Sequence, residues 1–150
     1  MLVQPPRLAI NVDLAAQRAM DHFEKVGFDR LSESDRILAT VWEFAAGVSN
    51  SGFSGYYVSR RADLAFYAPA ALQQIGAMEL AAIATEANAL FGPDGPAPDH
   101  KVRAEQLRQL GDPVRRQFTA LDDRYFDTEE DVDELLETWF LNHPKSLSAG

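Results

Sequence analysis

Residues 32–48 of the chain read SESDRILATVWEFAAGV. Apolar residues recur in this segment at every third or fourth position, which is the spacing of one face of an α-helix. Ser32 or Ser34 can cap the start of the helix, and the Ser-Asn-Ser-Gly sequence at 49–52 can end it. The segment therefore predicts an amphipathic helix that buries Ile37, Leu38, Val41, Phe44, Ala45 and Val48.

An N-terminal helix and a run of aromatic turns are predicted on either side of this segment. Residues 11–26 repeat the apolar spacing between Asn11, which can cap a helix, and Gly27, which can stop one. We expect this helix to pack on the rest of the chain. Residues 52–67 are rich in aromatic side chains and nearly lack the β-branched residues that strands favour, so short helical turns are predicted there.

The rest of the chain predicts further helices joined by short loops. Thr128 and Asp131 form a capping-box-like start for the last helix, and residues 92–100 form a Gly- and Pro-rich loop too short to separate two domains. The sequence therefore predicts an all-α fold, a compact single-domain bundle of about seven to nine helices over residues 1–150. The later helices are expected to begin near Pro69, Leu80, Lys101, Asp112 and Thr128.

Length and composition favour a globular, cytoplasmic protein. A chain of 150 residues buries roughly 68–70% of the surface that it exposes when unfolded, which is enough for a sizeable core. The chain contains no cysteine, so disulfides, thiolate metal ligands and thiol nucleophiles are excluded. The N-terminal residues do not read as a signal peptide, and no apolar run approaches the roughly 20 residues of a membrane span. We therefore expect a cytoplasmic location.

The charge of the chain is unevenly distributed. The formal net charge is −9, and residues 122–137 hold nine acidic residues and a single base, Arg124. An acidic protein repels the phosphate backbone, so direct binding to nucleic acid is not expected. Electrostatic complementarity instead favours a basic protein as the partner.

The acidic residues near the C-terminal end form the candidate partner-binding face. At about 100° per residue, Glu130, Glu134 and Glu137 fall together on the side of the last helix opposite its apolar stripe. Neighbouring acids on one helix face lie about 5–6 Å apart and can resemble a row of phosphates. Acids in a first turn also stabilise the helix dipole, and this simpler role covers residues 129–131. The candidate residues are Asp122, Asp123, Asp127, Glu130, Asp133, Glu134 and Glu137.

The sequence contains no motif for catalysis, a metal or a cofactor. The three histidines lie far apart, and none follows a glutamate by three residues as in helical di-iron proteins. A calcium loop starting at Asp127 would need glycine where Val132 stands. Phosphate-binding glycine loops and the nucleophile elbow of serine hydrolases are also missing. We therefore expect no enzymatic activity, no bound metal and no cofactor.

The aromatic turn at residues 50–57 offers an alternative site. In a structural interpretation, Gly52 permits a tight bend, and aromatic side chains anchor the bend in the core. In a functional interpretation, the turn lines a pocket for a small molecule or peptide, or belongs to an unrecognised enzyme. Both interpretations involve the same residues, namely Asn50, Gly52, Phe53, Tyr56, Tyr57 and Gly76.

Three segments of the chain resemble, in order, the motifs of a bacterial family named for a DNA-mimic protein. They are VSNSGFSGYY at 48–57, ALQQIGA at 71–77 and LDDRYF at 121–126. The family pattern reads Val-Asn-Asn-Gly-Gly-Phe-x-Gln-Tyr-Phe, then Ala-Leu-x-x-Ile-Gly-Ala, then Leu-Asp-x-x-Phe-Tyr. The resemblance covers about residues 32–143, and the chain departs from the pattern at Ser49, Ser51 and Gly55.

This resemblance implies an all-helical domain. For the named member it also implies an acidic surface that is shaped like duplex DNA and occupies the DNA site of a transcription factor. By this reading the chain is an acidic interaction module whose partner is a basic, DNA-binding protein. A homodimer remains compatible with the sequence, and no membrane partner is expected.

Overall fold

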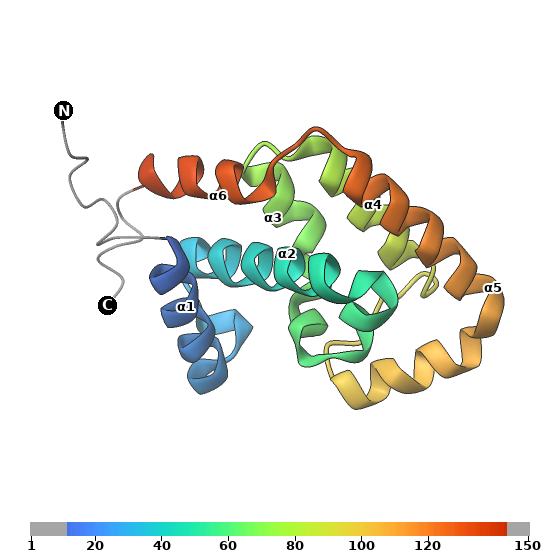
Figure 1. Cartoon of the computed structure of the whole chain (residues 1–150). Helices are drawn as coiled ribbons and strands as arrows, with labels where there is room; N and C mark the ends of the chain where they lie inside the picture. Colours follow the sequence, from blue (N-terminus) through green and yellow to red (C-terminus); the bar gives the residue numbers. More distant parts are fainter. Residues whose placement is uncertain (1–11, 144–150) are drawn as a thin grey trace.

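Helices account for most of residues 12–143, the part of the chain that the computed structural model describes (Figure 1). No strand occurs within these residues, so the all-α prediction is confirmed for them. The helices labelled η are 3-10 helices. The elements are α1 Val12–Val26, η2 Phe28–Arg30, α2 Glu33–Val58, η3 Arg60–Tyr67, α3 Ala68–Gln74, α4 Met78–Ala89, α5 His100–Asp127 and α6 Val132–Leu141.

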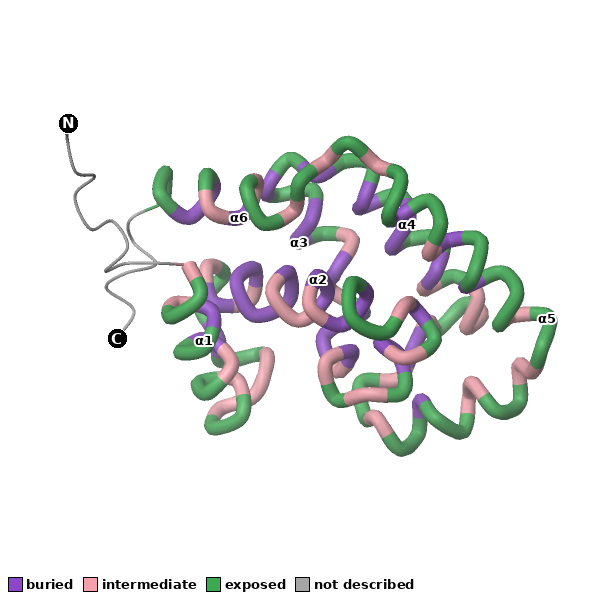
Figure 2. The backbone as a smooth tube through the Cα atoms, in the orientation of Figure 1, coloured by how far each residue is buried: buried purple, intermediate pink, exposed green. Residues whose placement is uncertain are grey.

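Helix α2 lies at the centre of the molecule, and the other elements pack around it (Figure 1). Its start is the predicted one, because the hydroxyl of Ser32 accepts a hydrogen bond from the backbone N–H of Asp35 at 3.1 Å. Helix α1 packs on α2, as expected, and ends where the sequence placed its stop, before Gly27. Half of the residues of α2 are buried, whereas most of those of α5 are exposed (Figure 2).

The structure has six α-helices within residues 12–143, fewer than the seven to nine predicted, because two of them continue through a bend. The sequence placed helix ends at Gly52 and at Gly111. Both glycines have a positive φ, 68° and 72°, and a non-helical backbone, so α2 and α5 each consist of two helical parts that meet at a kink. The predicted helix ends therefore coincide with these kinks, and the lower number of helices arises because α2 and α5 are each counted as one helix across its kink.

The last helix begins three residues later than predicted. The cap of α6 is Asp131, whose carboxylate accepts a hydrogen bond from the backbone N–H of Glu134 at 3.1 Å. Thr128 instead ends α5, and its hydroxyl donates a hydrogen bond to the carboxylate of Glu79. The capping-box prediction for Thr128 was wrong because residues 128–131 are not helical and Asp131 caps α6 in its place.

A buried arginine ties the loop at 92–99 to the core. Arg103 is completely buried, and its guanidinium donates hydrogen bonds to two carbonyl groups of the loop, those of Ala97 and Pro98. It also donates to the carbonyl groups of Tyr57 and Ser59, each at 2.6 Å, and to the carboxylate of Asp63 at 3.0 Å. One side chain thereby joins α5, the loop, the end of α2 and η3.

One cluster of buried hydrophobic residues extends from Ala16 in α1 to Phe140 in α6. Small side chains dominate α3 and α4, so these two helices pack closely against each other and α3 against α2. No helix of residues 12–143 is long and apolar enough to cross a membrane.

Candidate functional site

Four of the predicted acidic residues are exposed near the C-terminal end of the chain. Asp123 and Asp127 are one turn apart in the last part of α5, and Asp133 and Glu134 lie in the first turn of α6. Burial of part of its side chain raises the pKa of Asp133, and the neighbouring Asp131 raises it further. Carboxylates from two helices thus lie close to one connection, residues 128–131.

The only base of this segment does not neutralise these acids. Arg124 forms an ion pair with Glu86 of α4, at 2.7 Å between the guanidinium and the carboxylate. The hydrogen bond from Arg124 lowers the pKa of Glu86. The excess negative charge of residues 122–137 is therefore not cancelled by the arginine within it.

The carboxylate of Asp122 is hydrogen-bonded within the fold, so Asp122 does not belong to the exposed face. Its carboxylate accepts a hydrogen bond from the backbone N–H of Phe53 at 2.7 Å, directly after the bend at Gly52. Burial raises the pKa of the carboxyl group, and the hydrogen bond from Phe53 opposes the shift. Asp122 therefore joins α5 to the bend in α2, and its role is structural.

Glu130 likewise serves the fold. Its two carboxylate oxygens accept hydrogen bonds from the backbone N–H groups of Glu79 and Leu80, each at 2.8 Å. These amides are at the start of α4, where the helix itself offers no acceptor. The predicted row of Glu130, Glu134 and Glu137 on one helix face was wrong, since Glu130 precedes α6 and points to α4. Glu137 is half-buried on α6.

Replacing Glu130 with alanine is expected to lower the free energy of unfolding by about 1–2 kcal/mol, because two amides of α4 lose a charged acceptor. Urea denaturation followed by circular dichroism measures the change. The control is Glu129→Ala, which removes an exposed carboxylate from the adjacent position and is expected to change stability by less than about 0.5 kcal/mol. Equal effects of the two substitutions would contradict the capping role.

The aromatic turn lies inside the core. Phe53, Tyr56 and Tyr57 are at most 1% exposed, and their rings contact one another at centroid distances of 5.1–6.5 Å. The hydroxyl of Tyr57 donates a hydrogen bond to Asn88 at 2.6 Å, whereas the hydroxyl of Tyr56 is buried without a hydrogen-bond partner. Burial raises the pKa of both tyrosines. These side chains fill the core, as the structural interpretation of the turn expects.

Three other residues belong to the predicted set, and one of them, Gly52, forms the kink in α2. Asn50 is exposed on α2. Gly76 is exposed after α3, where its φ of 84° suits the end of that helix. The structure therefore does not bring the turn residues together around one cavity.

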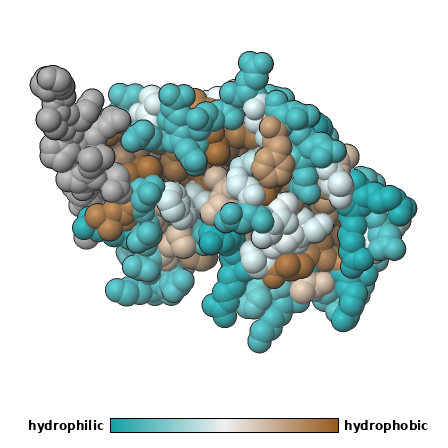
Figure 3. Space-filling view, viewed as in Figure 1, coloured by the Kyte–Doolittle hydropathy of each residue, from teal (hydrophilic) through white to brown (hydrophobic). Residues whose placement is uncertain are grey.

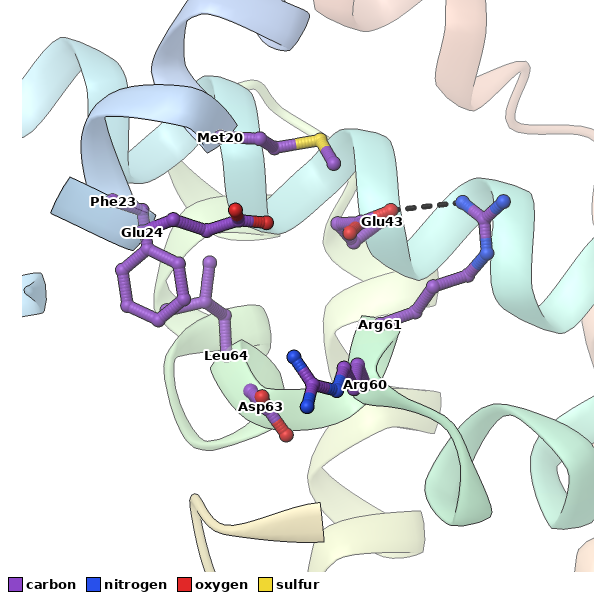
Figure 4. A pocket seen from close by; sticks show the side chains of 8 residues that line it. All are labelled: Met20, Phe23, Glu24, Glu43, Arg60, Arg61, Asp63 and Leu64. Carbon is purple, nitrogen blue, oxygen red and sulfur yellow. Dashed lines mark hydrogen bonds and ion pairs between the residues drawn. The ribbon is translucent and has the colours of Figure 1, made fainter.

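A small hollow lies between α1, α2 and η3 (Figure 4). Its volume of about 80 Å³ has room for a few water molecules. Arg61 pairs with Glu43 across one side at 2.8 Å, and burial raises the pKa of Glu43 despite this pairing. The lining residues are Met20, Phe23, Glu24, Glu43, Arg60, Arg61, Asp63 and Leu64.

A larger, open groove lies beside the acidic connection. Its volume is about 360 Å³, and it runs between α2, the start of α4, the end of α5 and the start of α6. In Figure 3, hydrophobic side chains line the seam between α6 and α2, and hydrophilic side chains border it. Sequence reasoning missed this groove, although the apolar Phe126 amid acidic residues was a visible signal. The lining residues are Ser49, Leu80, Tyr125, Phe126, Thr128, Glu129, Glu130, Asp131 and Val132.

Comparison with known proteins identifies the family. Searches of curated proteins and of solved structures give no match. The family model described as DMP19-like protein matches residues 29–143, which is more than half of the chain and includes the bend at Gly52, the groove and the exposed acids. The chain therefore belongs to the DMP19-like protein family.

Proposed function

We propose that this chain is a DNA mimic that binds the nucleic-acid-binding surface of a basic protein, such as a transcription factor. Membership of the DMP19-like family supports the proposal. The observation that carries it is the set of exposed carboxylates within residues 128–131 and on both sides of them. These acids are Asp123, Asp127, Glu129, Asp131, Asp133 and Glu134.

The charge pattern suits association with a cationic protein. The net charge is −9, and Arg124, the one base within residues 122–137, is paired with Glu86. Clustered charges of one sign steer an oppositely charged partner and raise the association rate, an effect that salt screens. Because the chain and DNA would occupy the same surface of the partner, the chain would compete with DNA for it. On this proposal the chain acts by binding and not by catalysis.

Competition with DNA tests the proposal. The protein is immobilised, incubated with a lysate of its host at low salt, and washed with increasing salt or with duplex DNA. We expect a DNA-binding protein to be retained and to be released by either treatment. Retention of proteins that do not bind DNA, or release by salt but not by DNA, would contradict mimicry.

Charge-neutralising variants test the location of the interface. The face variant replaces Asp123, Asp127 and Glu134 with Asn, Asn and Gln, and should weaken binding about tenfold, because each exposed ion pair contributes roughly 0.2–1 kcal/mol. The remote variant changes the net charge equally by neutralising exposed acids elsewhere, and should bind almost as the original protein does. Its substitutions are Asp21→Asn, Asp94→Asn and Glu105→Gln.

A further inference from the structure

We propose that the groove beside residues 128–131 is the docking site for an arginine side chain of the basic partner, with Phe126 as the surface on which the guanidinium stacks. This inference rests on the proposed function, since both require a basic protein. It adds a defined position and a preference for arginine over lysine. Acidic charge alone provides neither.

Phe126 is the most exposed large hydrophobic side chain within residues 12–143, at 60%. It lies in the last turn of α5, next to the buried Tyr125, and the two rings meet edge to face with centroids 5.2 Å apart. The hydroxyl of Tyr125 is in turn within hydrogen-bond distance of the Ser49 hydroxyl, at 2.9 Å. The buried neighbour is thus fixed, and Phe126 presents an aromatic surface at the groove.

The groove has an apolar floor and an acidic rim. Leu80 is buried beneath it, and Val132 is half-buried at its side. Glu129 and Asp131 are both exposed at the rim. The third rim carboxylate, that of Glu130, is directed to the amides of α4 and so is committed elsewhere. The carboxylate of Glu129 and the second oxygen of the Asp131 carboxylate, whose Oδ1 caps α6, therefore remain beside one exposed ring.

The backbone of the rim is held in place by hydrogen bonds. The N–H of Thr128 donates to the carbonyl of Arg124 at 3.1 Å, and the N–H of Glu130 donates to the Thr128 hydroxyl at 3.2 Å. Asp131 caps α6, so its carboxylate has a fixed position. A rim that is already ordered loses little conformational entropy when a ligand binds, which favours a specific contact.

Arginine fits this combination better than lysine does. A guanidinium is planar, stacks on an aromatic face and donates several hydrogen bonds in its plane, so one group can contact Phe126 and a rim carboxylate together. An ammonium group is more strongly hydrated and less suited to stacking. Another arginine of the chain already lies over an aromatic ring, since the guanidinium of Arg36 is 4.2 Å from the centre of the Phe28 ring.

The test compares two fluorescent probes that carry the same charge. One is a short peptide of alternating arginine and glycine, and in the other lysine replaces every arginine. Binding to the full chain is measured by fluorescence anisotropy at low salt. We expect the arginine peptide to bind more tightly than the lysine peptide, by about fivefold.

Substitutions at Phe126 separate stacking from charge. Phe126→Ala and Phe126→Leu should each lower the affinity for the arginine peptide about fivefold and leave the affinity for the lysine peptide unchanged. Both substitutions remove the aromatic face, and leucine does so while keeping an apolar side chain. The control is Phe66→Ala, which removes another exposed aromatic side chain, 43% exposed, from η3 and should leave both affinities unchanged. Thermal denaturation verifies that each variant is folded.

Substitutions at the rim locate the charge. Glu129→Gln with Asp131→Asn removes both carboxylates, and asparagine preserves the cap of α6. This double substitution should lower the affinity for the arginine peptide. The control, Asp21→Asn with Asp94→Asn, changes the net charge equally but away from the groove, and should lower that affinity less.

The outcomes distinguish the inference from the function on which it rests. If Phe126→Ala binds both peptides as the original protein does, the groove inference is wrong, whereas the proposed function survives if the face variant still loses the DNA-binding partner. If the face variant also keeps its partner, the proposed function fails as well. Equal affinity for arginine and lysine peptides would likewise overturn the inference and indicate attraction by charge alone.

Discussion

Replacing Arg103 with methionine is expected to lower the free energy of unfolding by about 3–5 kcal/mol, the largest loss that we expect from a single substitution. The methionine side chain fills much of the same volume but donates no hydrogen bond. Four carbonyl groups and the carboxylate of Asp63 would lose their donor, and the loop at 92–99 would lose its tie to η3. Urea denaturation measures this loss.

Two further variants show whether the loss arises from the hydrogen bonds. Arg103→Lys keeps a cation but offers fewer donors, so its stability should fall between those of the original protein and the methionine variant. Arg108→Met removes an exposed arginine, paired with Glu105 on the same helix, and should change stability by less than about 0.5 kcal/mol. A methionine variant at position 103 as stable as the one at position 108 would contradict the role assigned to Arg103.

Local signals predicted much of the fold, because helix starts and apolar stripes depend on neighbouring residues. The cap at Ser32, the end of α1 before Gly27 and the start of α3 around Pro69 all lie where the sequence placed them. The number of helices was overestimated because a glycine with positive φ either ends a helix or bends it. At Gly52 the carboxylate of Asp122, far away in sequence, packs against the kink, and no local signal in the sequence shows this contact.

The acidic residues could be found from the sequence but not sorted into exposed and structural ones. Asp122 and Glu130 look like their neighbours in sequence, yet their hydrogen-bond partners are 69 and about 50 residues away. Only the folded chain brings the bend of α2 and the start of α4 to these carboxylates. The exposed face therefore excludes Asp122 and Glu130. It includes Glu129 and Asp131, which the sequence analysis explained by the stabilising effect of acids in the first turn of a helix.

Arg103 was also missed, although the sequence held a signal. The loop at 92–99 contains three prolines, which have no backbone N–H, and its carbonyl groups have no helix or sheet to supply donors. A loop of this kind that packs on the core requires side-chain donors. Arg103 and Gln106, one turn apart at the start of α5, provide them to the carbonyl groups of Ala97 and Gly95.

Gly52→Ala is the second substitution with a large expected effect, a loss of about 2–4 kcal/mol. The φ of 68° and ψ of 178° at Gly52 form a combination that essentially only glycine adopts. A Cβ atom there would also lie 2.7 Å from a carboxylate oxygen of Asp122, the group that holds the N–H of Phe53. Alanine must therefore strain the bend or displace Asp122, and urea denaturation measures the combined loss.

A control and a double substitution divide this loss into its two causes. Gly76 has a φ of 84°, and a Cβ atom on it would meet no other atom within 4 Å, so Gly76→Ala measures the cost of a positive φ without a close contact, about 1 kcal/mol. Asp122→Ala removes the obstructing carboxylate. If the contact with Asp122 causes the excess, Gly52→Ala should cost clearly less in the Asp122→Ala background than in the original protein. Additive losses from the two substitutions would show that backbone strain alone accounts for the effect, and that Asp122 can move without disturbing the bend.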